Sequence, residues 1–271
     1  MIGYLKSFYR LQKDIYKERN LLMTLAKNDF KEQFSGSYLG IFWAILRPSL
    51  FVFIVWFIFS VGLKANLVGD GVPFILYFIA GYVPWFFFAD AIGTGMNSVV
   101  GNAYLVKRVD FKVNILPVVK IISALFLHSL FLVILIVVFL LQGYKPTIYW
   151  LQLPFYTLML SILLLGINYL ISSLRVFTKD VTQAVAVILQ FGFWVTPIFW
   201  SIDRVPEKYL SILELNPMVY IVTGYRNSFI NQVWFWETPM ATLYFLAISL
   251  FLLFVGGVVF RKLRPHFGDV L

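Results

Sequence analysis

Two apolar stretches of this 271-residue sequence carry polar and aromatic side chains at intervals that repeat with the α-helical period. The first set is Ser49, Phe53, Trp56 and Ser60, and the second set is Gln183, Gln190, Trp194 and Pro197. Spacings of three, four or seven residues place each set on one helical face. Flat aromatic rings suit the apolar C–H faces of sugar rings, and neighbouring amides can exchange hydrogen bonds with hydroxyl groups. Because lipid disfavours Gln and Ser, both faces are expected to contact protein or water, either as a conduit or as a close helix–helix contact.

The helices that position these two faces are predicted membrane spans. Of the residues, 61% are hydrophobic and 13% are charged, whereas soluble domains average about 45–50% and about 25%. A span needs about 20 mainly apolar residues. Six stretches qualify, and they are 38–63, 72–100, 113–141, 150–174, 181–200 and 239–260. The sequence therefore predicts an all-α integral membrane protein with a single domain over 1–271, in which spans one to five occupy 38–200.

The distribution of positive charge predicts which ends of the spans face the cytoplasm. Fifteen of the 22 Lys and Arg residues lie in the N-terminal segment, the second and fourth loops and the C-terminal segment, and five lie in the remaining loops. Because Lys and Arg concentrate in cytoplasmic loops, both termini are expected in the cytoplasm. The net charge of +9 therefore reflects topology, and no nucleic-acid partner is expected.

The two terminal segments are predicted to lie on the cytoplasmic side. Within 1–37, apolar residues recur at helical intervals over 2–19, with Lys and Arg between them. This pattern is typical of an amphipathic helix that lies in the interface plane on anionic membrane lipids. Residues 261–271 form a short basic tail.

The loop over 201–238 is much longer than an ordinary connection on the outer face. Pro206 and Pro217 each suit the first turn of a helix, so two short helices are expected, over about 206–215 and 217–230. Apolar helices of this length are too short to span a membrane. The loop therefore predicts a re-entrant helical pair before the last span, 239–260.

Arg47 and Pro48 interrupt the apolar run of the first predicted span. If the helix enters the membrane at Tyr38, Arg47 lies roughly 13 Å from that point. In a positional reading, 38–47 lie obliquely at the interface with Trp43 as an anchor, the Arg47 side chain snorkels, and the span begins near Pro48. In a substrate-facing reading, the Arg47 guanidinium pairs with a lipid phosphate at the inner leaflet.

The second loop, 101–112, is short and basic, yet it carries apolar side chains. Tyr104, Leu105 and Phe111 are expected to be exposed, as in a short amphipathic element that docks into a groove of a partner. A loop that only carries positive charge would not need the two aromatic residues. We therefore expect a partner protein on this side.

Enzymatic chemistry has no visible basis in the sequence. A Gly-rich phosphate-binding loop that ends in Lys-Ser or Lys-Thr is absent, and the chain has no cysteine. No metal-ligand spacing and no nucleophile–base set is present. His128, alone among apolar residues, is predicted to be a packing residue, and Asp90 is a stronger intramembrane candidate. The chain is expected to be no enzyme and to hold no cofactor.

Short motifs along nearly the whole chain carry a further pattern. They are FSGSYLGIFWAILRP (34–48), GYVPWFFF (81–88), NAYLVKRVDF (102–111), LRVFTKDV (174–181), FWVTPIFW (193–200), LNPM (215–218) and FGDVL (267–271). In this order, and with six spans, the chain resembles the permease subunit of type 2 ATP-binding-cassette (ABC) exporters for bacterial O-antigen, teichoic acid or capsule. Lys112 departs from the family pattern, which often has Pro at this point.

This resemblance implies a transport subunit that works with a separate cytoplasmic ATPase. Two copies of the permease would pair with two copies of the ATPase, which would bind ATP and Mg²⁺ in place of this chain. The stretch 102–111 would be the coupling helix seated in the ATPase. Its implied contact residues are Asn102, Tyr104, Leu105, Lys107, Arg108 and Phe111.

The resemblance also implies the substrate and the location. A polyprenyl-diphosphate-linked polysaccharide, foremost lipopolysaccharide O-antigen, would cross the bacterial inner membrane, and its diphosphate would meet basic residues on the cytoplasmic side. The dimer would enclose a channel between spans one and five of each copy. We expect Trp56, Gln190 and Trp194 to line this conduit.

Two other functions stay open at this point. A type 2 permease for a drug or a small lipid would show a different re-entrant region and a less aromatic path. A stand-alone secondary transporter would need paired ionisable residues near the bilayer midplane or an internal repeat of broken helices. The sequence shows neither such a pair nor an obvious repeat, so this function ranks last.

Overall fold

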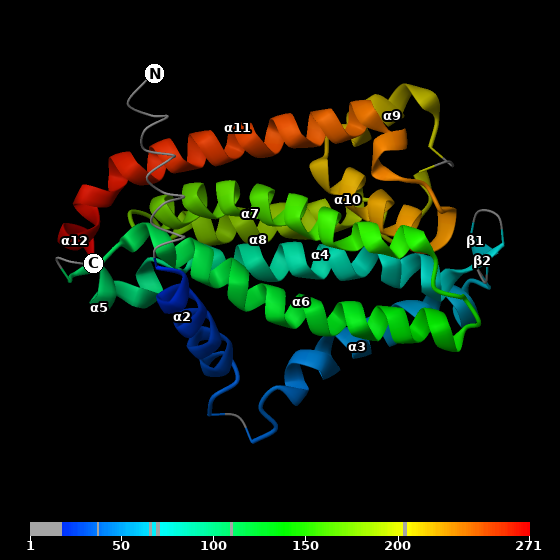
Figure 1. Ribbon diagram of the computed structural model, residues 1–271, viewed down its shortest axis with the longest axis horizontal. Helices are drawn as coiled ribbons and strands as arrows, with labels where there is room; N and C mark the ends of the chain where they lie inside the picture. The colour runs from blue at the N-terminus through cyan, green and yellow to red at the C-terminus, as the bar shows by residue number, and fades with distance from the viewer. Residues whose placement is uncertain (1–17, 37, 65–66, 69–70, 109–110, 203–204) are drawn as a thin grey trace.

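The computed structural model of this chain is an elongated bundle whose long helices run along its main axis (Figure 1). It describes residues 18–36, 38–64, 67–68, 71–108, 111–202 and 205–271. The α-helices are α2 (Arg19–Glu32), α3 (Phe42–Trp56), α4 (Phe74–Met96), α5 (Ala103–Val106), α6 (Leu116–Leu141), α7 (Leu153–Arg175), α8 (Asp180–Val195), α9 (Glu207–Glu214), α10 (Pro217–Arg226), α11 (Pro239–Leu263) and α12 (Phe267–Val270). Short 3-10 and π-helices extend or join them: η1 (Phe57–Gly62), η2 (Val100–Asn102), η3 (Val113–Ile115), η4 (Ile148–Gln152), η6 (Asn227–Asn231), η7 (Phe235–Glu237) and η8 (Arg264–His266). The predicted helical class is confirmed, with one addition: the short strands β1 (Leu67–Val68) and β2 (Val72–Pro73) form an antiparallel hairpin.

Five helices of the described chain are long and apolar enough to cross a membrane. They are Phe42–Gly62, Phe74–Met96, Val113–Leu141, Ile148–Arg175 and Pro239–Val270, and each overlaps one of the predicted spans. The remaining prediction, over 181–200, falls on α8, an apolar helix of 16 residues. α8 stops at Val195 because Thr196 precedes Pro197, and proline disfavours the helical conformation of the residue before it. Thr196 is accordingly extended, with ψ at 133°, so a helix continuing to residue 200 was a wrong prediction.

α3 passes through Pro48 instead of beginning there. The helix starts at Phe42, and Pro48 is buried within it. After Trp56 it widens into the π-helix η1, in which the Leu63 N–H donates to the Ile58 carbonyl at 2.8 Å. A π turn closes over one more residue than an α turn. Side chains after Phe57 therefore do not continue the helical faces that the residues of α3 form.

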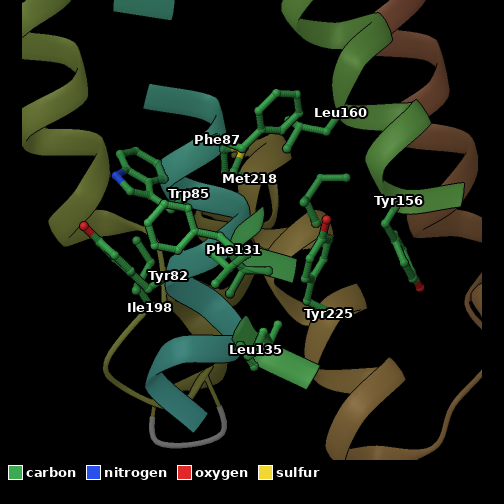
Figure 2. Close-up of a cluster of buried hydrophobic side chains, with 14 of the residues drawn as sticks. Tyr82, Trp85, Phe87, Phe131, Leu135, Tyr156, Leu160, Ile198, Met218 and Tyr225 are labelled. Carbon is green, nitrogen blue, oxygen red and sulfur yellow. The ribbon is translucent and has the colours of Figure 1, made fainter. Parts of the chain in front are cut away.

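The interior of the bundle is built around α4, which is the most buried of the five candidate spans. Figure 2 shows side chains of α4, α6, α7 and α10 meeting in one apolar cluster. The labelled members from these helices include Phe87, Phe131, Leu135, Tyr156, Leu160 and Tyr225. α11 lies along α7 (Figure 1), and glycines permit their close approach: Gly256 of α11 faces the Gly166 carbonyl of α7. Small residues at such contacts are typical of membrane helices.

Two short helices occupy the long loop, close to the predicted positions. α9 begins after Pro206, and α10 begins at Pro217, where the Asn216 side chain accepts a hydrogen bond from the Met218 N–H at 3.0 Å. An Asn at this N-cap position satisfies one of the donors that a helix start leaves unpaired. α10 then packs among the long helices, while α9 stays at the surface.

His128 of α6 packs against α10, as its isolation in an apolar segment predicts. Its Nε2 atom lies 2.9 Å from the Tyr225 hydroxyl, which lies 3.0 Å from the Thr157 hydroxyl of α7. The imidazole also stacks on Phe87 with ring centroids 4.5 Å apart. These contacts join four helices, so His128 has a packing role.

α2 crosses the bundle at an angle and packs against α6 (Figure 1). Asp29 forms an ion pair with Lys120 of α6, and the Gln33 amide donates to the Ser123 hydroxyl at 3.2 Å. The turn from α2 into α3 contains Gly36 and Gly40, whose positive φ values of 83° and 48° suit glycine. The amphipathic helix predicted over 2–19 lies almost wholly outside the described residues.

Candidate functional site

An aromatic cavity of about 330 Å³ lies between α3, α4 and α8. Its lining residues are Phe51, Tyr82, Trp85, Phe86, Ala89, Phe193 and Trp194. The ring centroid of Phe51 lies 5.3 Å from that of Tyr82 and 5.8 Å from that of Phe193. Figure 2 shows Tyr82 and Trp85 on the same side of α4. A concave surface of this kind offers flat apolar faces on several sides.

The polar face predicted on α8 exists over most of its length. Gln183, Gln190 and Trp194 lie on one uninterrupted helix and are exposed, with 60% of Trp194 accessible. Trp194 also lines the aromatic cavity, and its ring centroid lies 5.1 Å from that of Phe199. Pro197 does not belong to this face because it lies beyond the end of α8 and is buried.

The face predicted on α3 is shorter than expected. Ser49 and Phe53 are exposed, and the half-buried Trp56 lies 5.7 Å from Phe53 between ring centroids. Ser60 lies in the π-helix η1, so the α-helical spacing that assigned it to this face does not hold there.

Ring contacts join the two segments through residues outside the predicted faces. The aromatic contacts that join the α3 segment to the α8 segment run from Phe51 to Phe193 and from Phe59 to Phe199, each 5.8 Å between centroids. Periodicity missed Phe51, Tyr82, Trp85 and Phe193. The density of aromatic residues in GYVPWFFF and FWVTPIFW was the signal that could have found the last three.

Arg47 lines a second cavity, of about 370 Å³, between the start of α3 and the helices α4 and α6. Its side chain is exposed, and its guanidinium carbon lies 5.8 Å from the centroid of Trp43. Gln33 and Asp90 line the same cavity. The Arg47 guanidinium is therefore accessible to an anionic group, with Asp90 as an acidic neighbour in the same space.

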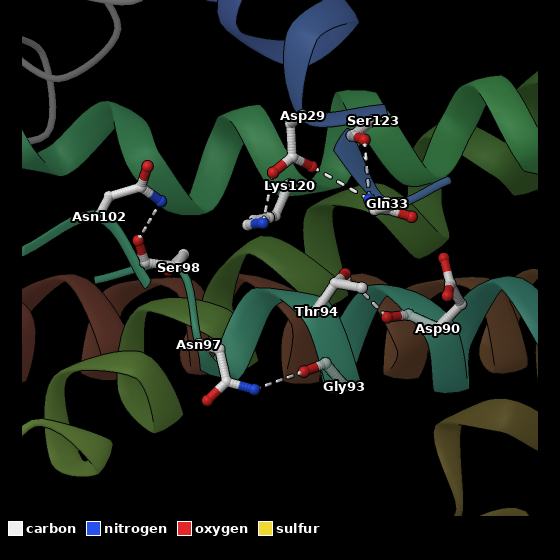
Figure 3. Close-up of polar contacts among 10 residues, drawn as sticks. All are labelled: Asp29, Gln33, Asp90, Gly93, Thr94, Asn97, Ser98, Asn102, Lys120 and Ser123. Atoms are coloured by element: carbon white, nitrogen blue, oxygen red, sulfur yellow. Dashed lines mark hydrogen bonds and ion pairs between the residues drawn. The ribbon is translucent and has the colours of Figure 1, made fainter. Parts of the chain in front are cut away.

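Figure 3 shows polar contacts of Gln33 and Asp90, two residues that line this second cavity, together with contacts farther along α4. The Gln33 amide donates both to Asp29 at 3.1 Å and to Ser123 at 3.2 Å. Asp29 also pairs with Lys120, so its charge is balanced by that of a lysine within a candidate span. On α4, the Thr94 hydroxyl donates to the backbone carbonyl of Asp90 at 2.9 Å and not to its side-chain carboxylate. These contacts hold α2 and the cavity wall in place.

The predicted coupling residues lie around α5, and of the three apolar side chains expected to be exposed only Tyr104 is. Tyr104 is 64% exposed, as expected, but Leu105 is only 9% exposed because it packs in an apolar cluster of the chain itself. Phe111 is half-buried and packs against the same cluster.

The polar members of the predicted coupling set lie at both ends of α5. Lys107 and Arg108, which directly follow the helix, are exposed. The Asn102 side chain donates to the Ser98 carbonyl at 2.9 Å (Figure 3) and closes the turn before α5. The exposed members of the predicted set are therefore Tyr104 of α5 and the two cations that follow the helix, Lys107 and Arg108.

Comparison with known proteins relates this architecture to membrane transport. The family described as "ABC-2 type transporter" matches residues 20–230, which include the helices from α3 to α10. The chain belongs to the ABC-2 type transporter family. Members of this family are membrane components of ABC transporters. The aromatic cavity and the polar face of α8 therefore belong to a transport subunit.

The relatives of this ABC-2 family member match it over nearly its whole length. An O-antigen export system permease protein RfbA from Klebsiella pneumoniae is 29% identical over 93% of this chain and 95% of its own length. The RfbA permease from Myxococcus xanthus is 26% identical over 96% of this chain and 98% of its own length. A polysialic acid transport protein, KpsM from Escherichia coli, is 22% identical over 86% and 89%.

Proposed function

We propose that this chain is the permease subunit of an ATP-driven exporter that moves a polyprenyl-diphosphate-linked polysaccharide out of the bacterial cytoplasm, with lipopolysaccharide O-antigen as the favoured substrate. The observation that carries the proposal is the match, over more than nine tenths of the chain, to permeases named for O-antigen export, which are more similar to this chain than the polysialic acid transport protein is. The aromatic cavity supports a carbohydrate substrate because its rings offer flat apolar faces.

In this proposal α8 crosses the inner membrane as a sixth span. Its 16 residues extend about 24 Å at about 1.5 Å per residue. The segment 196–200, which is not helical, follows it toward the end of the roughly 30 Å hydrocarbon core. Both termini and α5 then lie in the cytoplasm, as the distribution of Lys and Arg predicts, and α9 and α10 form the outer re-entrant pair. In support, α5 and α9 lie toward opposite ends of the bundle (Figure 1).

The permease acts as a homodimer whose conduit runs between the α3 and α8 faces of the two copies. Gln183 and Gln190 are exposed on α8, and lipid would leave their amides without hydrogen-bond partners. A second copy, or a water-filled conduit that it encloses, would solvate them. Ser49, Phe53, Trp56 and Trp194 would complete the conduit wall.

The lipid diphosphate is taken up at the Arg47 cavity on the cytoplasmic side. A guanidinium binds phosphate oxygens in a bidentate manner, and that of Arg47 is accessible. The separate ATPase, present in two copies, binds ATP and Mg²⁺ and docks on α5. Tyr104 contacts it there, while Leu105 holds α5 on the permease.

Reconstitution of the chain with its ATPase in vesicles tests this function. ATP-dependent translocation of a polyprenyl-diphosphate O-antigen, absent when the ATPase cannot hydrolyse ATP, is the expected result. Translocation of small amphiphiles alone, with no glycan moved, would favour a permease for a drug or a lipid instead.

The topology has a separate test because the chain has no cysteine. A cysteine placed at the exposed Ser211 of α9 should react with an impermeant reagent in intact cells freed of outer-membrane barriers. A cysteine at Lys107 should react only after lysis. The reverse pattern would contradict the proposed orientation.

A further inference from the structure

Segments from three parts of the sequence meet at the end of the bundle that carries α5 and α12 (Figure 1). The Phe267 side chain is fully buried, and its ring centroid lies 5.4 Å from that of Phe260 and 6.1 Å from that of Phe177. Leu105 of α5 is buried in the same apolar cluster. The turn after α7, the helix α5 and the segment 264–271 therefore form one joined surface instead of a loose loop and a loose tail.

A cavity of about 380 Å³ lies between α5 and the segment 264–271. Its lining residues are Val106, Lys107, Arg108, Phe111, Val113, Arg264, Pro265, Gly268 and Asp269. Three of these side chains are cationic and one is a carboxylate, so the cavity carries an excess of positive charge. Valine and phenylalanine side chains add an apolar portion to the wall. A matching occupant combines carboxylates with an apolar group.

This surface lies past the part of the chain that the hydrocarbon core can cover. α11 has 25 residues, which extend about 37 Å at about 1.5 Å per residue and exceed the roughly 30 Å core. Its last turn contains Arg261 and Lys262, and Arg264 follows it. Tyr104 and Val270, on the two helices that flank the cavity, are 64% and 50% exposed. These apolar groups are in water unless a protein covers them.

We propose that α5 and the segment 264–271 together form the docking site for the ATPase subunit, and that the cavity takes an acidic segment of that subunit with an apolar side chain at its tip. This inference rests on the proposed function because it concerns the same ATPase. It adds the segment 264–271 to a contact that the family resemblance implies for 102–111 alone. It also gives Phe267 a positioning role, since this residue holds the second half of the site against the first.

The composition of the cavity favours a protein segment over a lipid headgroup. An anionic headgroup needs only the basic side chains, and Asp269 would repel it. A protein segment gains from both portions of the wall, because protein interfaces combine an apolar centre with complementary charges at the rim.

The experiment measures how strongly the purified permease retains the ABC ATPase of the same export system. Arg264→Glu reverses one cavity charge and should weaken the affinity by about tenfold or more, since like charges across an interface are strongly unfavourable. Lys262→Glu makes the same change of charge on an exposed residue that does not line the cavity, and it should retain the ATPase. Asp269→Asn should strengthen the affinity, by about two- to fivefold.

A crosslinking measurement does not depend on the strength of binding. A single cysteine at Gly268 that carries a photoactivated crosslinker should capture the ATPase, and one at Ser211 should not. Equal losses with Arg264→Glu and Lys262→Glu would overturn the site, because bulk charge alone would then be at work. If Arg264→Glu retains the ATPase but no longer binds phosphatidylglycerol vesicles, the surface binds the membrane instead. That result would also overturn the docking site.

The docking site and the proposed function fail in different ways. If the wild-type chain does not retain the ATPase at all, the proposed function falls. If the wild-type chain and the Arg264→Glu and Asp269→Asn variants retain it equally, only the docking site falls.

Discussion

Of the two helices α8 and α10, the longer one, α8, is the less buried. α8 has 16 residues, and Val185 is its one buried residue. α10 has ten residues, and seven of them are buried. The two helices have the same amphipathic appearance in sequence, yet α10 lies in the interior of the bundle and α8 lies on its surface.

The difference lies in the contacts that each helix can make with its neighbours. Gly224 of α10 lets the Tyr156 ring lie directly against the helix backbone, and Gly81 of α4 makes room for Arg226. The Arg226 guanidinium lies 3.5 Å from the Tyr77 ring centroid and donates to the Ile198 carbonyl at 2.6 Å. α8 has one comparable position, Gly192, which faces the edge of Trp85. Directed polar contacts and small residues thus decide burial here more than apolar length does.

The strongest test of the comparison is the removal of the Arg226 contacts. Arg226→Met loses the cation–π contact and the hydrogen bonds to Ile198 and Tyr77. Because bonds to a charged donor are worth roughly 1.5–3 kcal/mol each, we expect the free energy of unfolding to fall by about 3 kcal/mol or more. Thermal unfolding of the detergent-solubilised protein measures this loss. Lys208→Met, at an exposed site on α9, is the control, and an equal loss there would contradict the anchoring role of Arg226.

The close approach of α10 to α7 is the next contact to break. Gly224→Ala places a methyl group on the Tyr156 ring, and overpacking of this kind costs roughly 1–3 kcal/mol. Gly257→Ala on α11 is the matched control, because no atom lies within 4 Å of its added Cβ. It should be neutral or slightly stabilising. The same thermal measurement should separate the two variants, and equal midpoints would refute the packing argument.

A smaller effect is expected from the buried hydroxyl of α10. Tyr225→Phe removes the contacts to His128 and Thr157 while keeping the ring, so the loss should be about 1–2 kcal/mol. Tyr209→Phe, on the exposed α9, should change stability by less than about 0.5 kcal/mol. Combining Tyr225→Phe with Thr157→Val should cost less than the sum of the single losses, since both variants break one shared network. Simple additivity would show that the network is not shared.

Substitutions on the exposed face of α8 are expected to change stability least and to reduce transport strongly. Gln190→Ala removes an exposed side chain, so stability should change by less than about 0.5 kcal/mol. Export should nevertheless fall for Gln190→Ala, for Trp194→Ala and for Trp56→Ala, with dimer and ATPase assembly intact, if these side chains line the conduit. Phe251→Ala, at a 63% exposed position of α11, is the control for lost apolar surface. Full export by the Trp56→Ala/Trp194→Ala double variant would remove these residues from the conduit.

Sequence periodicity predicted the helices well where burial does not depend on distant partners. The apolar runs of α4, α6, α7 and α11 exceed the length of a membrane span, so composition alone identifies them. Pro206 and Pro217 marked the starts of α9 and α10 because proline is favourable in the first turn and unfavourable later. Pro197 carried an equally local signal for the end of α8, and the sequence prediction overlooked it.

The site was predicted less completely because its members come from helices distant in sequence. An exposed α8 face follows from spacing, but the aromatic cavity needs Phe51, Tyr82 and Phe193 from three helices. Leu105 was expected to face a partner because it is apolar in a basic loop. In the structure it lies in a buried cluster with Leu22 and Phe267, which are far from it along the chain on either side, and with the nearby Val113.

The sequence by itself determined the membrane class, the helical positions, the expected orientation and the polar face of α8, because each depends on composition or on spacing within one segment. Only the tertiary structure decided which helix is interior, since the burial of α10 depends on Gly81, Tyr156 and His128 of three other helices. It also decided that α5 and the segment 264–271 share one cavity. No local pattern encodes such a contact, because it arises when residues more than 150 positions apart in the chain pack around the same buried Phe267.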